Sequence, residues 1–231
     1  MAVIAVRSTR GLLLCALAAL PVVALLAACG SGRPGAGDPS TPPASTLAAS
    51  PSTSPAECGS CQPRQSVQLA SGDQVRLWLS TDQQDYRSRP VVELLVAGRP
   101  VQSWPAPQGD GWNGTLTCLD GATPNCVLID SVGMHASIAE LLLVKDGRLV
   151  HPQKAEVTAD SPGMKAADLD HDGYLDVVGT TNDYAPNYAQ GHNYWQTFRC
   201  TDGEFVPTGC ARQAGVPAPT RLLSGTCPPQ G

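Results

Sequence analysis

Short apolar runs separated by turn residues dominate the chain from Ser66 onward. The runs are rich in Val, Leu, Thr and aromatic residues, and Gly, Pro, Asp and Asn interrupt them every few residues. No long stretch repeats its apolar positions with the 3.6-residue period of a helix. The pattern therefore predicts an almost entirely β domain.

Three hairpins are expected within this pattern, because each pairs two apolar runs across a short turn. Two of the turns are Asp-Gly, which is a strong hairpin signal. The hairpins and their turns are 91–103 with Ala97-Gly98, 139–151 with Asp146-Gly147, and 194–207 with Asp202-Gly203.

The hairpins are also similar to one another in sequence and recur roughly every 50 residues, a spacing typical of propeller repeats of about 40–50 residues. We therefore expect three blade-like units, at roughly 66–107, 112–157 and 158–210. Ordinary propellers have about four to eight blades, so the prediction is a small propeller-like or blade-repeat domain. A β-sandwich is the alternative, if the hairpins share only their turn chemistry.

The first 28 residues have the order of an export signal, with Arg7 and Arg10 before an apolar run at 11–28. The run ends in Leu-Ala-Ala-Cys at 26–29, which resembles the lipobox of bacterial lipoproteins. That resemblance implies a mature chain that begins at Cys29, is acylated on its sulfur and is held by the lipid bilayer at the outer face of the bacterial cytoplasmic membrane. An ordinary secretory signal cleaved nearby is the alternative.

A linker is expected after the lipidated cysteine. Residues 30–57 are mostly Gly, Ser, Pro, Thr and Ala, with three charged residues, and such a composition cannot bury enough apolar surface to fold. The predicted organisation is therefore a signal peptide at 1–28, a lipidated Cys and disordered linker at 29–57, and a β domain at 58–231.

Charge and cysteine content restrict the partners and the compartment. Without the signal, thirteen basic residues face twenty acidic ones, so the net charge falls from −5 to −7, and no basic block occurs. Nucleic acid is therefore not an expected partner. Seven cysteines remain after Cys29, and in an oxidising compartment they predict disulfides, with one thiol left over. Short separations favour Cys118 with Cys126 and Cys200 with Cys210, and the C-x-x-C pair Cys58 and Cys61 is read as a structural bridge rather than a redox centre.

One segment, 168–176, carries four carboxylates in nine residues. Such a cluster predicts a hard cation with oxygen ligands, Ca²⁺, and Gly173 permits the sharp turn around it. An EF-hand is excluded because its twelfth position needs Glu, whereas Gly179 stands here. The predicted ligands are the side chains of Asp168, Asp170, Asp172 and Asp176 and the main-chain carbonyl of Tyr174.

The segment Ala-Ala-Asp-Leu-Asp-His-Asp-Gly-Tyr-Leu-Asp-Val-Val at 166–178 resembles the calcium loop of FG-GAP or VCBS repeats, which are integrin-type propeller repeats. The resemblance covers about fifteen residues and implies the same five ligands and a loop between two strands of one blade. Family members often have Gly where His171 stands. The implied role of calcium is structural, as a staple of the turn.

The function expected from these features is a surface-anchored, non-enzymatic binding or structural module. No nucleophile elbow, Walker loop or Rossmann fingerprint occurs. An aromatic segment that follows the calcium loop is a possible binding surface for a protein or glycan ligand. The alternative is a secreted hydrolase, or an inhibitor of one, acting at the cell envelope. The residues of the possible surface are Tyr184, Tyr188, Tyr194 and Trp195.

Overall fold

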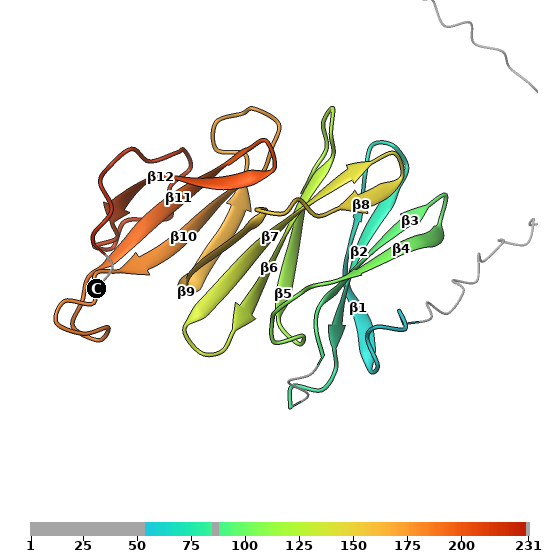
Figure 1. The fold of residues 1–231 in the computed structure, drawn as a ribbon, viewed down its shortest axis with the longest axis horizontal. Coiled ribbons are helices and arrows are strands. Elements are labelled where there is room, and N and C mark those ends of the chain that lie inside the picture. The colour runs from blue at the N-terminus through green and yellow to red at the C-terminus, as the bar shows by residue number, and fades with distance from the viewer. Residues whose placement is uncertain (1–53, 85–87, 230–231) are drawn as a thin grey trace, which may run out of the picture. The chain divides into compact units, whose positions relative to one another are not determined.

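The computed structural model describes residues 54–84 and 88–229, and all twelve of its regular elements are β-strands (Figure 1). The predicted signal peptide, the predicted lipidation site Cys29 and the linker up to residue 53 lie outside the described residues. Within 54–84 and 88–229 there is no helix with the length and hydrophobicity that crossing a bilayer requires. The all-β prediction is confirmed.

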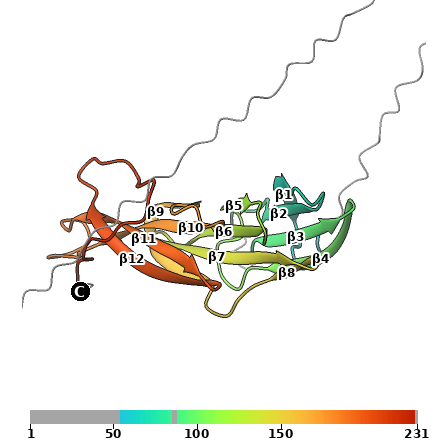
Figure 2. The ribbon, with the colours of Figure 1, turned by 90° about the horizontal axis from the view of Figure 1, so that it is seen from above.

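The strands form two antiparallel sheets. The first sheet contains four strands in the order β1-β2-β3-β4. The second contains eight, in the order β12-β11-β10-β9-β7-β6-β5, with β8 paired to β7 beside this path. In Figures 1 and 2, β1–β4 and β9–β12 lie at opposite ends, with β5–β7 between them.

The strand bounds follow the predicted units. The first unit comprises β1 (Cys61–Gln68), β2 (Gln74–Ser80), β3 (Val91–Val96) and β4 (Arg99–Pro105). The second comprises β5 (Gly114–Leu119), β6 (Asn125–Val132), β7 (Ala136–Lys145) and β8 (Arg148–Val150). The third comprises β9 (Glu156–Ala167), β10 (Asp176–Asn182), β11 (Asn193–Thr201) and β12 (Glu204–Arg212).

All three predicted hairpins are present, as β3–β4, β7–β8 and β11–β12. Both residues of each turn have positive φ, which is the requirement of a type I′ turn whose twist matches that of paired strands. The φ values are 50° and 75° at Ala97 and Gly98, 51° and 68° at Asp146 and Gly147, and 54° and 79° at Asp202 and Gly203. Turn chemistry therefore fixes the register of each hairpin.

Strand β7 is apolar almost throughout because both of its faces are buried. Leu142 and Val144 point into a core shared with the first sheet, whereas Leu141 and Leu143 point into a second core that includes Val177 and other residues of the third unit. Alternate side chains of a strand point to opposite faces, so one continuous apolar run fills two cores. Strand β7 therefore contributes side chains to both apolar cores of the domain.

The three predicted units correspond to three consecutive four-stranded meanders, but they do not stand as separate blades. The first half of β7 pairs with β9, from Ala136 opposite Asp160 to Glu140 opposite Glu156, so the second and third units share one sheet. The first sheet packs on this larger sheet through a common core, as in a sandwich. Neither sheet closes on itself, and the described strands do not show the closed ring of a propeller.

Three disulfides lie within the described residues. Cys118 is bonded to Cys126, the pair expected from their short separation, and Cys58 is bonded to Cys61. The third disulfide joins Cys210 to Cys227.

The predicted pairing of Cys200 with Cys210 is wrong. Cys210 is bonded to Cys227, and Cys200 is a free, buried thiol. The register of β11 and β12 explains the difference, because Cys200 lies opposite Phe205 while Cys210 lies opposite Gln196. Four residues of strand separate the two positions by about 13 Å, well beyond the Cα spacing of about 4.4–6.8 Å that a disulfide spans.

Candidate metal centre

The acidic loop joins β9 to β10 and brings three of the four predicted carboxylates together. Asp168, Asp170 and Asp176 each offer a carboxylate oxygen, and these oxygens lie within 4.8 Å of one another. Asp168 and Asp170 are half-buried, and Asp176 is fully buried at the first position of β10. Three converging carboxylates on one loop are a ligand set suited to a hard cation.

Main-chain N–H groups hold the loop in shape. Asp168 accepts hydrogen bonds from the N–H groups of Asp172 and Gly173, each at 3.2 Å, and Asp172 Oδ1 accepts one from Tyr174 N–H at 2.9 Å. His171 and Gly173 have φ of 62° and 90°, so both occupy the left-handed region. His tolerates this region better than most residues do.

Asp176 connects the loop to the core. Its Oδ2 accepts a hydrogen bond from Leu169 N–H at 2.9 Å, and its Oδ1 accepts one from Cys200 N–H on β11, also at 2.9 Å. Burial raises the pKa of the Asp176 carboxyl, the two N–H donors oppose that rise, and the neighbouring charges of Asp170 and Asp172 add to it. A cation beside this group would relieve both the burial penalty and the repulsion.

A buried asparagine from the neighbouring unit forms hydrogen bonds with the main chain of the loop. Asn125 of β6 is fully buried, and its side-chain oxygen accepts a hydrogen bond from Leu175 N–H at 2.9 Å. Its amide nitrogen donates to Gly173 O, also at 2.9 Å. The side chain thus satisfies two main-chain groups on either side of Tyr174, so the second unit fixes the conformation of a loop in the third.

Arg199 of β11 occupies the open side of the loop. Its Nε lies 2.8 Å from Asp170 Oδ2, and a terminal nitrogen lies 3.2 Å from Asp172 Oδ2. These carboxylates raise the pKa of the Arg199 guanidinium, first through the hydrogen bond to Asp172 and then through the charge of Asp170. A fixed positive charge therefore already neutralises part of the acidic loop.

The other oxygen of Asp170 shows that this neutralisation is incomplete. Asp170 Oδ1 is buried and has no hydrogen-bond partner among the described residues. Buried carboxylate oxygens are normally hydrogen-bonded or bound to a metal, so an oxygen without a partner indicates room for a ligand. The residues present therefore fit Ca²⁺, with Asp168, Asp170 and Asp176 as the side chains that would hold it.

Asp172, one of the four predicted carboxylates, makes other contacts in the structure, whereas the main-chain carbonyl of Tyr174 stays a predicted ligand. Asp172 lies outside the triad, because its two oxygens contact Arg199 and Tyr174 N–H. The Tyr174 side chain packs, partly buried, against the second apolar core. Arg199 and Asn125 were not predicted, since each lies more than twenty residues from the loop and neither position carries a sequence signal that connects it to the loop.

The predicted aromatic surface divides into two parts. The Tyr184 and Tyr188 rings have centroids 5.6 Å apart, and His135 from the β6–β7 turn joins them at 5.5 Å from Tyr188. We call His135, Tyr184 and Tyr188 the aromatic shelf. Trp195 does not belong to it, because its Nε1 donates to Val216 O, and Tyr194 is held through its hydroxyl by Asp183.

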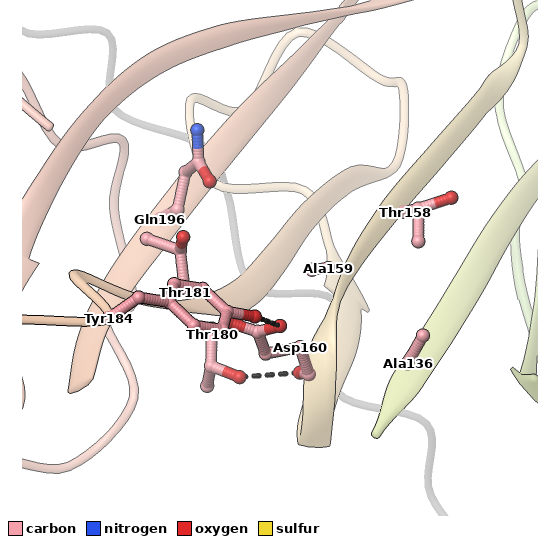
Figure 3. Close-up of a pocket in the computed structure, with 8 residues that line it drawn as sticks. All are labelled: Ala136, Thr158, Ala159, Asp160, Thr180, Thr181, Tyr184 and Gln196. Carbon is pink, nitrogen blue, oxygen red and sulfur yellow. Dashed lines mark hydrogen bonds between the residues drawn. The ribbon is translucent and has the colours of Figure 1, made fainter. Parts of the chain in front are cut away.

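A polar hollow of about 400 Å³ adjoins the shelf (Figure 3). Tyr184 belongs to both, and its hydroxyl donates a 2.9 Å hydrogen bond to Asp160 Oδ1. Thr180 on the neighbouring strand donates through its hydroxyl to Asp160 O. The polar side chains that line the hollow are Thr158, Asp160, Thr180, Thr181, Tyr184 and Gln196.

Two further acids have raised pKa values but are enclosed. Burial, with help from the charges of Glu156 and Asp130, raises the pKa of Glu140 to about 8. Burial also raises the pKa of Asp130 to about 7, and Asp110 adds to the rise. Glu140 is 0% exposed and Asp130 is 2% exposed, so both residues belong to the interior of the domain.

Comparisons of the chain with models of protein families, with curated proteins and with solved structures find no match.

Proposed function

We propose that this protein is a membrane-anchored extracytoplasmic lipoprotein whose β domain is stapled by one calcium ion and acts as a binding module. The anchor is the acyl group on Cys29, and the Pro- and Ser-rich linker holds the domain away from the bilayer. The oxidising exterior expected for such a protein agrees with three disulfides in the described residues.

The calcium part of the proposal rests on one observation, the buried Asp170 Oδ1 without a partner inside a triad of carboxylates. When bound, the ion supplies positive charge to these oxygens. Asp168 and Asp170 contribute ligands from the loop, and Asp176 contributes one from β10. The site is structural, because Asp176 ties it through Cys200 N–H to the centre of the third unit.

The binding part rests on the exposed aromatic surface. Tyr184 is 41% exposed, Tyr188 is 37% exposed, and Met134 beside His135 is 87% exposed. Exposed aromatic side chains on loops held by a rigid sheet are typical of recognition surfaces. The acidic loop ends at the first residue of β10, and the loop with Tyr184 and Tyr188 follows its last residue. A calcium ion in the acidic loop therefore stabilises the strand that carries the aromatic surface. In this proposal the three meanders are blade-like repeats, and only the third binds calcium.

Thermal unfolding of the full chain, titrated with calcium and with a chelator, tests whether calcium stabilises the domain. Calcium at ten times the Kd stabilises the folded state by about 1.4 kcal/mol, which raises Tm by roughly 3–6 °C for a domain of this size. Asp170→Ala should abolish the rise. Asp146→Asn, in a turn remote in sequence where Asn is tolerated, should keep it. A Tm that is unchanged by millimolar calcium in the unaltered chain would remove the staple from the proposal.

The anchor is tested separately. Mass spectrometry of the mature protein should find an acylated Cys29 at its N-terminus, and Cys29→Ser should release the chain from the membrane fraction. An unmodified N-terminus in the membrane-associated protein would favour the ordinary secretory signal instead.

A further inference from the structure

We propose that the aromatic shelf and the adjoining polar hollow form one binding site for a neutral glycan. This inference deepens the proposed binding function and does not depend on the calcium loop. It follows from three properties of the site, namely the contact between the shelf rings, the hydrogen-bonding groups of the hollow and the charge around both.

The shelf is continuous rather than split. The centroid separations of 5.5 and 5.6 Å between neighbouring rings are those of aromatic groups in mutual contact. Neighbouring rings are tilted by 49° and 51° to one another, so a sugar ring packs its C–H face on one partly exposed ring of the shelf through dispersion contacts.

The hollow offers hydrogen-bonding groups of both kinds beside that surface. Asp160 Oδ1 is engaged by Tyr184, but its Oδ2 makes no hydrogen bond to any described residue. The Gln196 amide and the Thr158 hydroxyl likewise make none within 54–84 and 88–229, and both residues line the hollow. A carboxylate accepts, an amide donates and accepts, and a sugar hydroxyl matches each of them.

The hollow and shelf are joined rigidly through one residue. Tyr184 supplies its ring to the shelf and its hydroxyl to Asp160, while Thr180 fixes the main chain at Asp160. A site held in this way loses little freedom when a ligand binds. The volume of about 400 Å³ falls within the range of about 300–1,000 Å³ typical of small-ligand sites, so the hollow takes a short unit of a chain rather than a whole polymer.

Charge selects a neutral ligand. The lining of the hollow includes the carboxylate of Asp160 and no lysine or arginine. Asp183 beside the shelf is ionised over the whole neutral range, because hydrogen bonds, first from His192 N–H, lower its pKa to about 2. An anionic polymer would meet the carboxylates of Asp160 and Asp183 here, whereas an uncharged polyol would meet no such repulsion.

The test is a titration of the full chain, followed by ¹H–¹⁵N NMR, with dextran, mannan and arabinogalactan oligosaccharides. Polygalacturonate serves as the anionic probe and choline as the ammonium probe. At least one neutral glycan should shift the Gln196 side-chain amide and the signals of His135 and Tyr188 in a saturable way. Tyr188→Ala and Asp160→Ala should each weaken the apparent Kd by about tenfold or more, because each removes a direct contact. Tyr194→Phe, at the start of β11 and outside the shelf, should leave it unchanged.

Three results would overturn the inference: neutral glycans that bind equally well to both variants, saturable shifts with only polygalacturonate or choline, or no shifts with any probe. Repeating the titration with calcium and with a chelator separates this inference from the proposed function. Glycan binding in a chain that calcium does not stabilise would leave the glycan site standing and remove the staple. Calcium stabilisation without glycan binding would do the reverse.

Discussion

Arg199 forms an ion pair with Asp170, at 2.8 Å between Nε and Oδ2, on the carboxylate that also carries the buried oxygen without a partner. The same guanidinium contacts Asp172. The Arg199 guanidinium therefore stabilises the loop in the absence of metal and repels a second cation bound close to it. Arg199 is 45% exposed at its side chain, so solvent screens the pair and its net contribution is modest.

We expect Arg199→Gln to tighten calcium binding while lowering the stability of the metal-free protein. Without calcium, the acidic loop loses its only neighbouring counter-charge among the described residues, and Tm should fall. With calcium, Asp170 is released to the ion, and the apparent Kd should fall by roughly two- to fivefold, because an exposed ion pair contributes little. Calorimetric titration and thermal unfolding measure the two effects.

Arg212→Gln is the matched control for charge, because Arg212 is an exposed arginine at the far end of β12. It should change neither the calcium midpoint nor the metal-free Tm beyond the effect of overall charge. A variant at Arg199 that weakens calcium binding would show that the guanidinium organises the site instead of competing for it.

Asn125 should control the loop from the neighbouring strand. Asn125→Ala leaves Leu175 N–H and Gly173 O buried without their side-chain partners, and the free energy of unfolding should fall by about 2–4 kcal/mol. The calcium midpoint should rise as well, because the loop loses its fixed shape. Urea unfolding and calcium titration check the two results.

Asn125→Asp separates the two hydrogen bonds, since it keeps an acceptor for Leu175 N–H and loses the donor to Gly173 O. Because the new carboxylate would be fully buried and would face the Gly173 carbonyl, we expect a loss of stability at least as large as for Asn125→Ala. Equal stability of both variants and the unaltered chain would contradict the anchoring role of this residue.

The disulfide between Cys210 and Cys227 should pin the C-terminal segment to β12. It closes a loop of 17 residues, and Cys210 N–H also donates to Gly225 O at 2.8 Å. Cys227→Ser should lower the free energy of unfolding by about 3 kcal/mol on the chain-entropy estimate. Peptide mapping without reductant should recover Cys210 joined to Cys227.

Cys200 is the matched control, because it is buried and unpaired. Cys200→Ala should keep the disulfide map and cost less stability than Cys227→Ser. In the unaltered mature domain, a thiol reagent should find no reactive cysteine in the native state and one after denaturation. Recovery of a peptide joining Cys200 to Cys210 would contradict the register of β11 and β12.

Local turn chemistry was enough to predict the hairpins, whereas the pairing between distant segments was not predictable. Asp146-Gly147 and Asp202-Gly203 specify a type I′ turn by themselves, so the strands beside them follow. The pairing of β7 with β9 joins two different units and depends on how they pack, and no short motif encodes it.

The candidate metal site was likewise predictable only in part. The spacing of Asp168, Asp170 and Asp176 within one loop placed their carboxylates together, as predicted. Arg199 and Asn125 reach the loop only because β11 and β6 lie beside it in the folded sheet, so they could not be found without the structure. The prediction that Cys200 pairs with Cys210 was wrong for the same reason. The register of β11 and β12, and not the separation in sequence, determines which cysteines meet.

Glu140 is the most unusual buried group of the domain, because both of its carboxyl oxygens lack a partner among the described residues. It lies on β7 opposite Glu156 of β9, and Asp130 of β6 adds a second negative neighbour. Burial and these charges raise its pKa from an ordinary value of 4.5 to about 8 in the folded state. Between these two values the folded state keeps a proton that the unfolded state loses.

The stability of the domain should therefore fall as pH rises through the window from about 4.5 to 8, by at most about 1.4 kcal/mol per pH unit for this one group, and then level off. Urea unfolding at pH 5 to 8 in a chelator measures the slope, and Glu140→Gln should make it shallower, most clearly between pH 7 and 8, where the contribution of Asp130, with a pKa of about 7, declines. Glu156→Gln removes a neighbouring charge, so it should end the window at lower pH. A slope in Glu140→Gln equal to that of the unaltered chain would show that Glu140 is already ionised in the folded protein.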